Sequence, residues 1–228
     1  MNVWNQFFWV IFPYLMITVF LVGHFFRYLT DQTGWTSKSS EFLEKRSLRW
    51  GSLLFHYGIW FVFGGHVVGL LVPKSLLSRV GVSDEAYHLM AVYLGGLAGL
   101  IAILGLLILI VRRYGDTYIS LTSSFGDKLI AVLLLLVMGF GIYNTLGFNL
   151  LTEGFDYRST ISPYLRSLII FAPDSRLMMG VPLTYQLHVF LAFLVMGIWP
   201  FTRLVHVWSI PVAYVKRSPI IYRSARLK

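Results

Sequence analysis

The sequence contains no cysteine and few charged residues, and each absence excludes a class of protein. Without cysteine, the chain can form no disulfide, hold no iron–sulfur cluster through thiolates and attach no haem covalently at a CxxCH site. Charged residues make up 13% of the 228 positions, whereas an average soluble domain has about 25%. Any redox cofactor must therefore be held without cysteine sulfur, in a chain whose composition is unlike that of a soluble domain.

Five long stretches of the sequence contain no Asp, Glu, Lys or Arg. Each is at least 23 residues long, and an α-helix needs about 20 residues to cross the ~30 Å hydrocarbon core of a bilayer. They predict an all-α integral membrane bundle of five transmembrane helices, formed by one domain over residues 1–228. The stretches are 1–26, 50–73, 89–111, 129–152 and 177–202, and the helices are expected at about 3–27, 50–72, 88–111, 128–148 and 182–208.

The basic residues predict the orientation of this bundle. The first positive charge, Arg27, follows the first span, so we expect that span to be retained rather than cleaved as a signal peptide. With Met1 outside, 14 of the 19 Lys and Arg residues fall on one side of the membrane. The positive-inside rule then places the N-terminus outside and the C-terminus in the cytoplasm. Orientation, anionic lipid headgroups and a docked partner thus explain the net charge of +9, and nucleic-acid binding is not expected.

The longest outer connection, roughly residues 147–176, contains the segment YLRSLIIF (164–171) between two prolines. Its mixture of large apolar and basic residues predicts a short helix that lies on the outer membrane surface. The other connections are too short to form a soluble domain, so no large water-facing active site is expected.

Histidines stand out in so apolar a sequence, and the second and fifth spans carry two each. The second span runs outward, which places His56 near the inner face and His66 near the outer face. The fifth span runs inward, which places His188 outside and His206 inside. Histidines of equal depth can then meet as His56–His206 and His66–His188. Haem iron takes two axial nitrogens, and neutral imidazole supplies them; alternatively, any single membrane histidine can be a packed, hydrogen-bonded side chain.

Helix geometry permits this pairing but leaves one mismatch. At 100° per residue, His56 and His66 differ by about 80° around their helix, and His188 and His206 share a direction. Along the helix axes, however, the first two lie ~15 Å apart and the second two ~27 Å apart. Helix tilt, slanted haem planes or a bend at Pro200 would be needed to bring both pairs level.

Three glycines of the second span, Gly58, Gly65 and Gly69, form a stripe beside His66. Such a stripe admits either a flat cofactor ring or the backbone of a neighbouring helix, and the spacing favours neither.

Two further histidines lie outside these pairs. His24, near the inner end of the first span, is expected to have a packing role. His88 stands beside Tyr87 at the outer start of the third span. These two residues form a candidate site for a quinol headgroup, close to the depth of the His66–His188 pair.

Two segments resemble a known family. They are LLFHYGIWFVFGGHVVGLLVP (53–73), preceded by GWTSKSSEFLEKRSLRWGS (34–52), and YQLHVFLAFLVMGIWPFTRLVHVWSIPVAY (185–214). Both are similar to the cytochrome b, or gamma, subunit of membrane-bound respiratory nitrate reductase. The likeness covers essentially the whole chain, and FTRLVHVWSIP is its most specific part.

The resemblance implies two b-type haems. Their axial ligands would be His56 and His206 for the inner haem, and His66 and His188 for the outer one. It also implies a quinol-oxidising subunit of the prokaryotic cytoplasmic membrane. Menaquinol or ubiquinol would be oxidised on the outer side, protons would be released there, and electrons would pass inward through the haems.

The resemblance further implies two cytoplasmic partners, an iron–sulfur (beta) subunit and a molybdenum catalytic (alpha) subunit that reduces nitrate to nitrite. Nothing in this chain binds nitrate.

The same family often carries a lysine for quinol binding near the start of the third span. This sequence has AYHLM there, so either Tyr87 or His88 substitutes or the site is built differently. Arg112 and Arg203 are the candidates for binding the propionates of the inner haem, since guanidinium suits carboxylate well. Arg112, together with Arg113, could equally face lipid headgroups.

Two other functions remain open. Dihaem membrane subunits of heterodisulfide-reducing or sulfite-reducing complexes have a similar bundle, and the identity of the partner subunit would decide between them. A small transporter without cofactor is the second alternative. Transporters usually carry carboxylates within the membrane, and none of the five spans contains Asp or Glu.

Overall fold

The computed structural model describes residues 3–31, 40–41, 43–151 and 154–208, and within these ranges it is helical, with no β-strand. Five helices are long and apolar enough to cross a membrane, which confirms the predicted all-α membrane bundle. They cover Val3–Thr30, Arg46–Leu71, Asp84–Gly115, Phe125–Gly147 and Leu183–Phe201.

Most of the five spans are composite helices. The first comprises α1 (Val3–Gln6), a π-helical turn (Phe7–Ile11) and α2 (Phe12–Thr30). The others are built in the same way, from α3 (Arg46–His66) with Val67–Leu71, from α5 (Asp84–Met90), Ala91–Gly95 and α6 (Gly96–Gly115), from α8 (Phe125–Ile142) with Tyr143–Gly147, and from α11 (Leu183–Ile198) with Trp199–Phe201.

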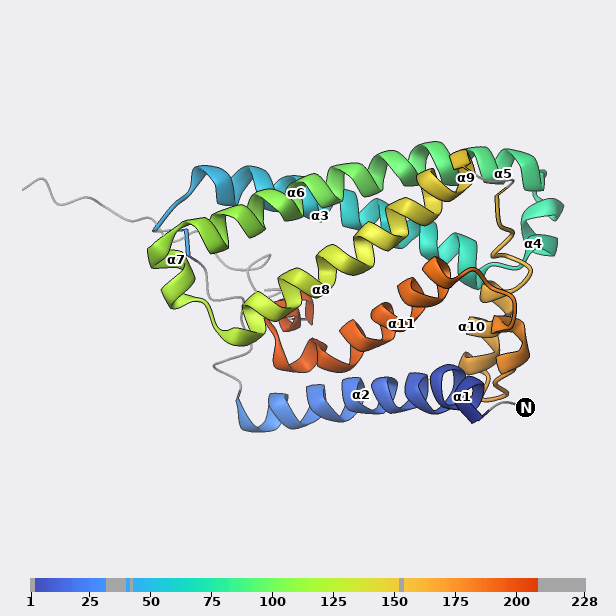
Figure 1. The fold of residues 1–228 in the computed structure, drawn as a ribbon, viewed down its shortest axis with the longest axis horizontal. Helices are drawn as coiled ribbons and strands as arrows, with labels where there is room; N and C mark the ends of the chain where they lie inside the picture. Colours follow the sequence, from blue (N-terminus) through green and yellow to red (C-terminus); the bar gives the residue numbers. More distant parts are fainter. Residues whose placement is uncertain (1–2, 32–39, 42, 152–153, 209–228) are drawn as a thin grey trace, which may run out of the picture.

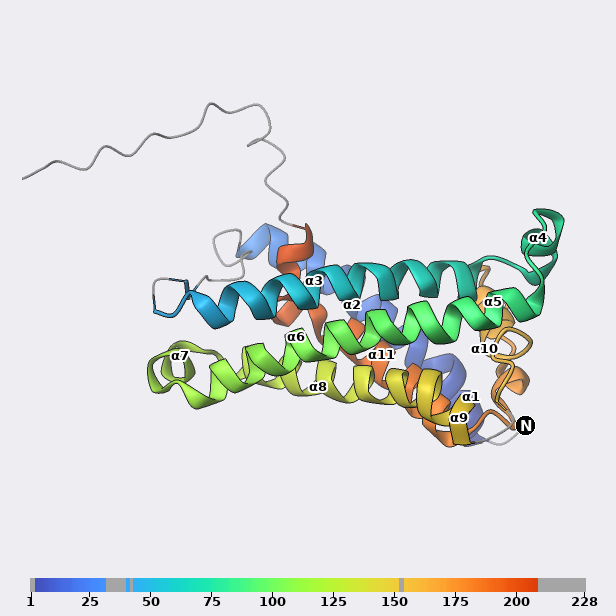
Figure 2. The ribbon, with the colours of Figure 1, turned by 90° about the horizontal axis from the view of Figure 1, so that it is seen from above.

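Successive spans run in opposite directions along the long axis of the molecule (Figures 1 and 2). In space, α2 packs against α11, α11 against α8, α8 against α6, and α6 against α3. Many large apolar side chains face outward, among them Trp60 and Phe61, as expected for helices surrounded by lipid. The second and fifth spans, which carry the paired histidines, do not form one of these packed helix pairs with each other.

Small residues bring α3 and α6 into close contact. A Cβ atom at Gly58 would meet the backbone of Ala102 at 2.6 Å, and one at Gly105 would meet the backbone of Phe55. Such contacts are the usual basis of helix association in lipid, where burial of apolar surface supplies little. Of the glycine stripe, Gly58 therefore serves helix packing.

The two ends of the bundle differ. One end carries the short helix α7 (Thr117–Thr122), the start of α3 and the end of α6, and we call it the Arg112 end (Figure 1). Here Ser124 and Asp127 form a reciprocal capping box that begins α8.

The opposite end, called here the Tyr87 end, carries α4 (Lys74–Arg79), α5, α9 (Phe148–Leu151) and α10 (Ile161–Ile169). Helix α10 lies across this end over a buried cluster that includes Trp9 and Tyr164 (Figure 1). The predicted short helix of the outer connection is therefore present. It begins earlier than expected and includes Pro163 in its first turn, where a missing N–H group leaves no helical bond broken.

The fifth span breaks before His206. Helix α11 ends at Ile198, a short 3₁₀ turn follows (Trp199–Phe201), and Thr202 is extended (φ −122°, ψ 177°) before a second 3₁₀ segment, Arg203–Trp208. The assumption of one continuous helix from His188 to His206 is therefore wrong. The bend at Pro200, one of the three ways suggested above to bring both histidine pairs level, is present.

Candidate cofactor site

Four imidazole rings face one another in two pairs. The ring centroids of His66 and His188 lie 6.0 Å apart with an interplanar angle of 31°. Those of His56 and His206 also lie 6.0 Å apart, at 73°. The structure thus brings together the histidines that depth alone paired, and their role as metal ligands stays a prediction.

The spacing of each pair fits one metal ion between two imidazoles. Metal–imidazole bonds of about 2 Å and about 1.2 Å from each ring centre to its nitrogen give a centroid separation of about 6.4 Å. The observed 6.0 Å agrees with this value. No group of three or more His, Cys, Asp or Glu side chains suits a metal ion among the described residues. The 6.0 Å spacing of each pair suits a centre with two histidine ligands.

Hydrogen bonds fix the tautomer of all four rings. The Nδ1 atoms of His56 and His66 contact carbonyl oxygens one turn back on the same helix, those of Ser52 and Val62, both at 2.7 Å. Those of His188 and His206 contact the carbonyl oxygens of other segments or turns, Val137 at 2.8 Å and Arg203 at 2.6 Å. A carbonyl only accepts, so Nδ1 carries the proton and Nε2 carries the lone pair that binds a metal.

Sequence reasoning missed two residues that position His188, both on α8. Val137 supplies the carbonyl oxygen for Nδ1, and Gly141 lies one turn further along. A Cβ atom at Gly141 would lie 2.9 Å from Cε1 and 3.4 Å from Nδ1 of the His188 ring. The glycine therefore leaves the room that the imidazole occupies. Four-residue spacing of a glycine on an apolar helix is too common a pattern to reveal this from sequence.

The second span leaves open space beside its histidines. A Cβ atom at Gly65 would meet no other atom within 4 Å, and both His56 and His66 are exposed in the chain by itself. A hollow of about 370 Å³ adjoins His56, lined by Ser52, Leu53, Tyr57 and Trp60. An imidazole exposed within a membrane span is unfavourable unless a partner covers it. These features provide room for a flat ligand beside His56, and the backbone next to His66 is open at Gly65.

Gly69 has a different surrounding from Gly65. The Tyr87 hydroxyl covers Gly69, and the Tyr157 hydroxyl would lie 3.0 Å from a Cβ atom added there. The two hydroxyls are hydrogen-bonded to each other at 2.8 Å. Burial, and then the hydrogen bond with Tyr87, raise the pKa of Tyr157, so it stays a neutral phenol. His88, next to Tyr87 in sequence, is exposed.

Charged residues surround this tyrosine pair at the Tyr87 end. Lys74 bridges Asp84 at 3.6 Å and Asp156 at 2.6 Å, and Arg158 contacts Asp84 at 3.3 Å. Partial burial raises the pKa of Asp156, but the hydrogen bond and charge of Lys74 outweigh it and hold the pKa below its ordinary value. The ion pairs link α4, α5 and the connection before α10.

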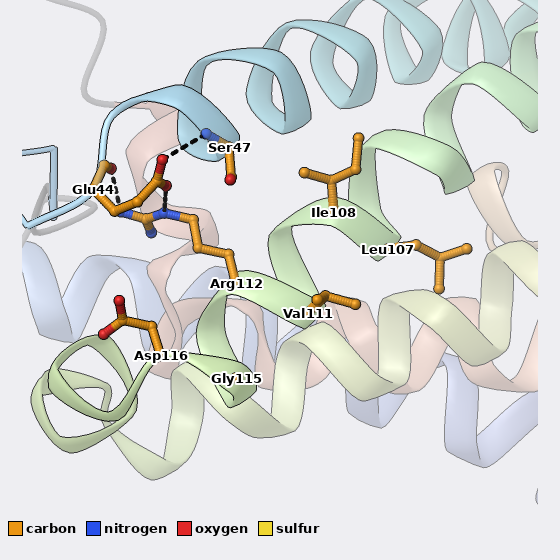
Figure 3. A pocket seen from close by; sticks show the side chains of 8 residues that line it. All are labelled: Glu44, Ser47, Leu107, Ile108, Val111, Arg112, Gly115 and Asp116. Carbon is orange, nitrogen blue, oxygen red and sulfur yellow. Dashed lines mark hydrogen bonds and ion pairs between the residues drawn. The ribbon is translucent and has the colours of Figure 1, made fainter.

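Arg112 has several protein partners at the other end. Its guanidinium is buried and donates to the Glu44 carboxylate at 2.7 Å, to the Glu44 carbonyl at 2.7 Å, and to the hydroxyl and carbonyl of Ser40 at 2.9 and 3.0 Å. Figure 3 shows it reaching Glu44 beside an open groove of about 550 Å³. The backbone N–H of Ser47 lowers the pKa of Glu44, and Arg112 adds to this effect. Its predicted role as a propionate ligand stays a prediction, and its observed role is to hold the segment before α3.

Arg203 is likewise paired within the chain. Its Nε donates to Asp127 at 2.9 Å, and Arg113 approaches the same carboxylate at 3.8 Å. The backbone of Arg203 also accepts the His206 Nδ1 proton. The residue therefore joins the start of α8 to the His206 segment, and propionate binding by its side chain stays a prediction.

Arg27 stabilises the break in the fifth span. Its Nη1 donates to the carbonyl oxygens of Pro200 and Thr202, at 2.5 and 3.2 Å, at the point where the helix is interrupted. Close packing assists, because a Cβ atom at Gly23 would meet Pro200 at 2.9 Å. Sequence reasoning assigned Arg27 only to orientation and missed this role. The predicted packing role of His24 agrees with its edge-on contact with the Phe20 ring, 4.4 Å between centroids.

Comparison with known proteins assigns the chain to a family. The sequence profile of the nitrate reductase gamma subunit matches residues 5–225. The nitrate reductase gamma chain of Bacillus subtilis (strain 168) is 47% identical over 219 residues, which cover 96% of this chain and 98% of the relative. The respiratory nitrate reductase 2 gamma chain of Escherichia coli (strain K12) is 34% identical over 223 residues, 97% of this chain and 98% of the relative.

A longer relative shares the same segment. The nitrate reductase-like protein NarX of Mycobacterium tuberculosis (strain H37Rv) is 39% identical over 221 residues, which cover 96% of this chain but 34% of that protein. The resemblance seen in the sequence is thereby confirmed. The chain belongs to the nitrate reductase gamma subunit family, the membrane subunits of respiratory nitrate reductase.

Proposed function

We propose that this chain is the dihaem cytochrome b subunit through which respiratory nitrate reductase takes electrons from quinol in the prokaryotic cytoplasmic membrane. The observation that carries the proposal is the pair of imidazole pairs, each 6.0 Å between ring centroids and each with Nδ1 held by carbonyl oxygens. Family membership supports it, since the relatives are named as chains of nitrate reductase.

His56 and His206 would hold one b-type haem, and His66 and His188 the other. When bound, the two haem irons would supply one-electron redox chemistry along the bundle. The protein contributes fixed imidazole orientation through the Nδ1 hydrogen bonds, which spare the ligands reorganisation. It also contributes open space at Gly65 and apolar surroundings that keep water away from the sites.

A quinol would release two electrons and two protons at the Tyr87 end, next to the His66–His188 pair. The exposed imidazole of His88 is suited to accept a proton from a quinol hydroxyl, because imidazole is the side chain that most often acts as a general base. Tyr87 is suited to a supporting role, since its hydroxyl is already bonded to Tyr157 and packed on Gly69.

The Arg112 end would face the cytoplasm and the partner subunits. The excess of Lys and Arg in the connections at this end supports that orientation. An iron–sulfur beta subunit docked there would accept electrons near the His56–His206 pair, and a molybdenum alpha subunit would reduce nitrate to nitrite.

The test uses the intact complex in membranes. Purified complex should show a reduced-minus-oxidised b-type spectrum with two haems per copy of this chain. Replacing His66 with glutamine should abolish nitrate reduction by quinol, whereas reduction by a soluble one-electron donor that reacts directly with the partner subunits should persist. A complex without b-type absorbance, or a His66 variant with full quinol activity, would contradict the proposal.

A further inference from the structure

Arg158 has two buried donor groups that the protein does not use. The residue precedes α10, and 6% of its surface is exposed. Its Nη1 donates to Asp84, and its guanidinium lies over the Tyr87 ring at 4.0 Å from the centroid. Its Nε and Nη2 atoms are buried, without a hydrogen-bond partner in the described part of the chain. Arginine does not deprotonate in proteins, so these are charged donors whose burial calls for an acceptor.

The two unused donors define the shape of that acceptor. Nε and Nη2 form the side-on edge of a guanidinium, which matches both oxygens of one carboxylate. The same chain shows this at Arg176, whose Nε and Nη2 donate to the two carboxylate oxygens of Asp174 at 2.8 and 2.9 Å. A quinol hydroxyl or carbonyl offers a single oxygen and fits this edge poorly.

In the described part of the chain, the two carboxylates beside Arg158 already have other partners. Asp84 contacts its Nη1 through one oxygen and Lys74 through the other. Asp156 accepts a hydrogen bond from Lys74 at 2.6 Å. The acceptor for the open edge must therefore come from outside these side chains.

Arg158 is also close to one histidine pair. The Tyr87 ring beneath its guanidinium carries the hydroxyl that covers Gly69. Gly69 follows His66 by three residues, within the next turn of the same span. The ligand expected at His66 and His188 has carboxylates of its own, because haem b carries propionates at one edge.

We propose that Arg158 binds a propionate carboxylate of the haem held by His66 and His188, side-on through Nε and Nη2. This inference rests on the proposed function, since it requires a haem at that pair. Tyr87 carries the guanidinium on its ring face, and Asp84 holds the opposite nitrogen, so the open edge is oriented before the ligand arrives.

The test compares Arg158→Gln with Arg158→Lys in the purified complex, after two haems per wild-type chain have been established. A cation beside a haem favours the reduced iron, so Arg158→Gln should lower the midpoint potential of the His66–His188 haem and leave the other haem unchanged. Arg158→Lys keeps the positive charge but loses the pair of side-on N–H donors. The midpoint potential of the His66–His188 haem should therefore stay close to the wild-type value. That haem should, however, be lost to an excess of apomyoglobin about tenfold faster or more.

Arg176→Gln is the matched control, because it removes an exposed arginine with the same side-on geometry at the same end. It should change neither the potential nor the rate of haem loss. Asp84→Asn weakens the contact that orients the guanidinium, so it should speed loss of the same haem, but less than Arg158→Gln does. If Arg158→Gln fails to assemble, Arg158→Lys still gives the loss rate.

Three results would overturn the inference. The first is an unchanged potential and loss rate in both Arg158 variants. The second is an equal shift in Arg176→Gln, which would indicate a general effect of charge. The third is an effect that disappears when bound lipid is removed, which would identify a lipid phosphate as the ligand. Absence of haem from the wild-type His66–His188 pair would instead refute the proposed function.

Discussion

Replacement of Gly141 by alanine tests how α8 positions His188. The added Cβ atom would lie 2.9 Å from Cε1 of the ring, whereas carbon atoms prefer separations of about 3.5–4.0 Å. The imidazole must therefore move by roughly 0.6 Å or more, which exceeds the ~0.5 Å within which ligands of a preorganised site are held. Such a shift also weakens the bond from Nδ1 to the Val137 carbonyl.

The expected energy of this change is modest but selective. Overpacking costs about 1–3 kcal/mol and a weakened hydrogen bond about 1 kcal/mol, while alanine returns about 1 kcal/mol of helix propensity. A net loss of about 1–3 kcal/mol would weaken binding at the His66–His188 pair by about one to two orders of magnitude. Potentiometric titration of the b-type absorbance and low-spin haem EPR would detect the change in this haem alone.

Gly139→Ala is the matched control for this experiment. Gly139 lies on the same helix and gains the same propensity, but its Cβ atom would meet no other atom within 4 Å. We expect Gly139→Ala to retain the wild-type spectra and potentials. If Gly141→Ala matched Gly139→Ala in haem content, potential and EPR, the account of how α8 positions His188 would be refuted.

Three further predictions concern other parts of the bundle. Arg27→Gln removes two hydrogen bonds from the break in the fifth span, so the His206 haem should be lost about tenfold faster on dilution; equal loss of both haems would contradict this. Gly105→Ala places a Cβ atom against the α3 backbone, and the melting temperature should fall, because overpacking costs about 1–3 kcal/mol. Gly95→Ala is the control, because its Cβ atom would meet nothing within 4 Å. Equal melting temperatures of the two variants would count against the packing argument. Asp156 has a folded pKa below its ordinary value, so its contribution to the stability of the Tyr87 end is present above about pH 4 and is lost as the pH falls through the folded pKa. Asp156→Asn should remove this acid-induced loosening, which hydrogen exchange between pH 3 and 6 would measure. An identical acid profile in the variant would exclude the ion pair as its cause.

The sequence was sufficient for the spans and for the histidine pairing. Long stretches without charge leave little alternative to helices in lipid, and the alternating direction of the spans fixes which histidines share a depth. The interruption at Pro200 could be anticipated only as one of several ways to bring both histidine pairs level, given the different axial spacing of the histidines in the second and fifth spans. Its extended residue, Thr202, depends on hydrogen bonds from Arg27, which lies more than 170 residues away in sequence.

The surroundings of the histidines could not be predicted because they arise from tertiary contacts. The carbonyl oxygen of Val137 reaches His188 only through the packing of α8 on α11. Propionate binding by Arg112 stays a prediction, and the contacts of its donors with Glu44 and Ser40 of a preceding connection could not be foreseen. Depth follows from chain position, whereas the direction of a long side chain depends on which acceptors the fold brings near it.

Haem counting in paired double variants tests the central claim most directly. Glutamine at both His66 and His188 should remove one haem and leave one haem per chain, because only one pair is disrupted. Glutamine at both His66 and His206 should leave none, because each pair loses a ligand. Pyridine haemochrome analysis of the purified complexes gives both numbers, and one haem in the second variant, or none or two in the first, would contradict the assignment of ligands.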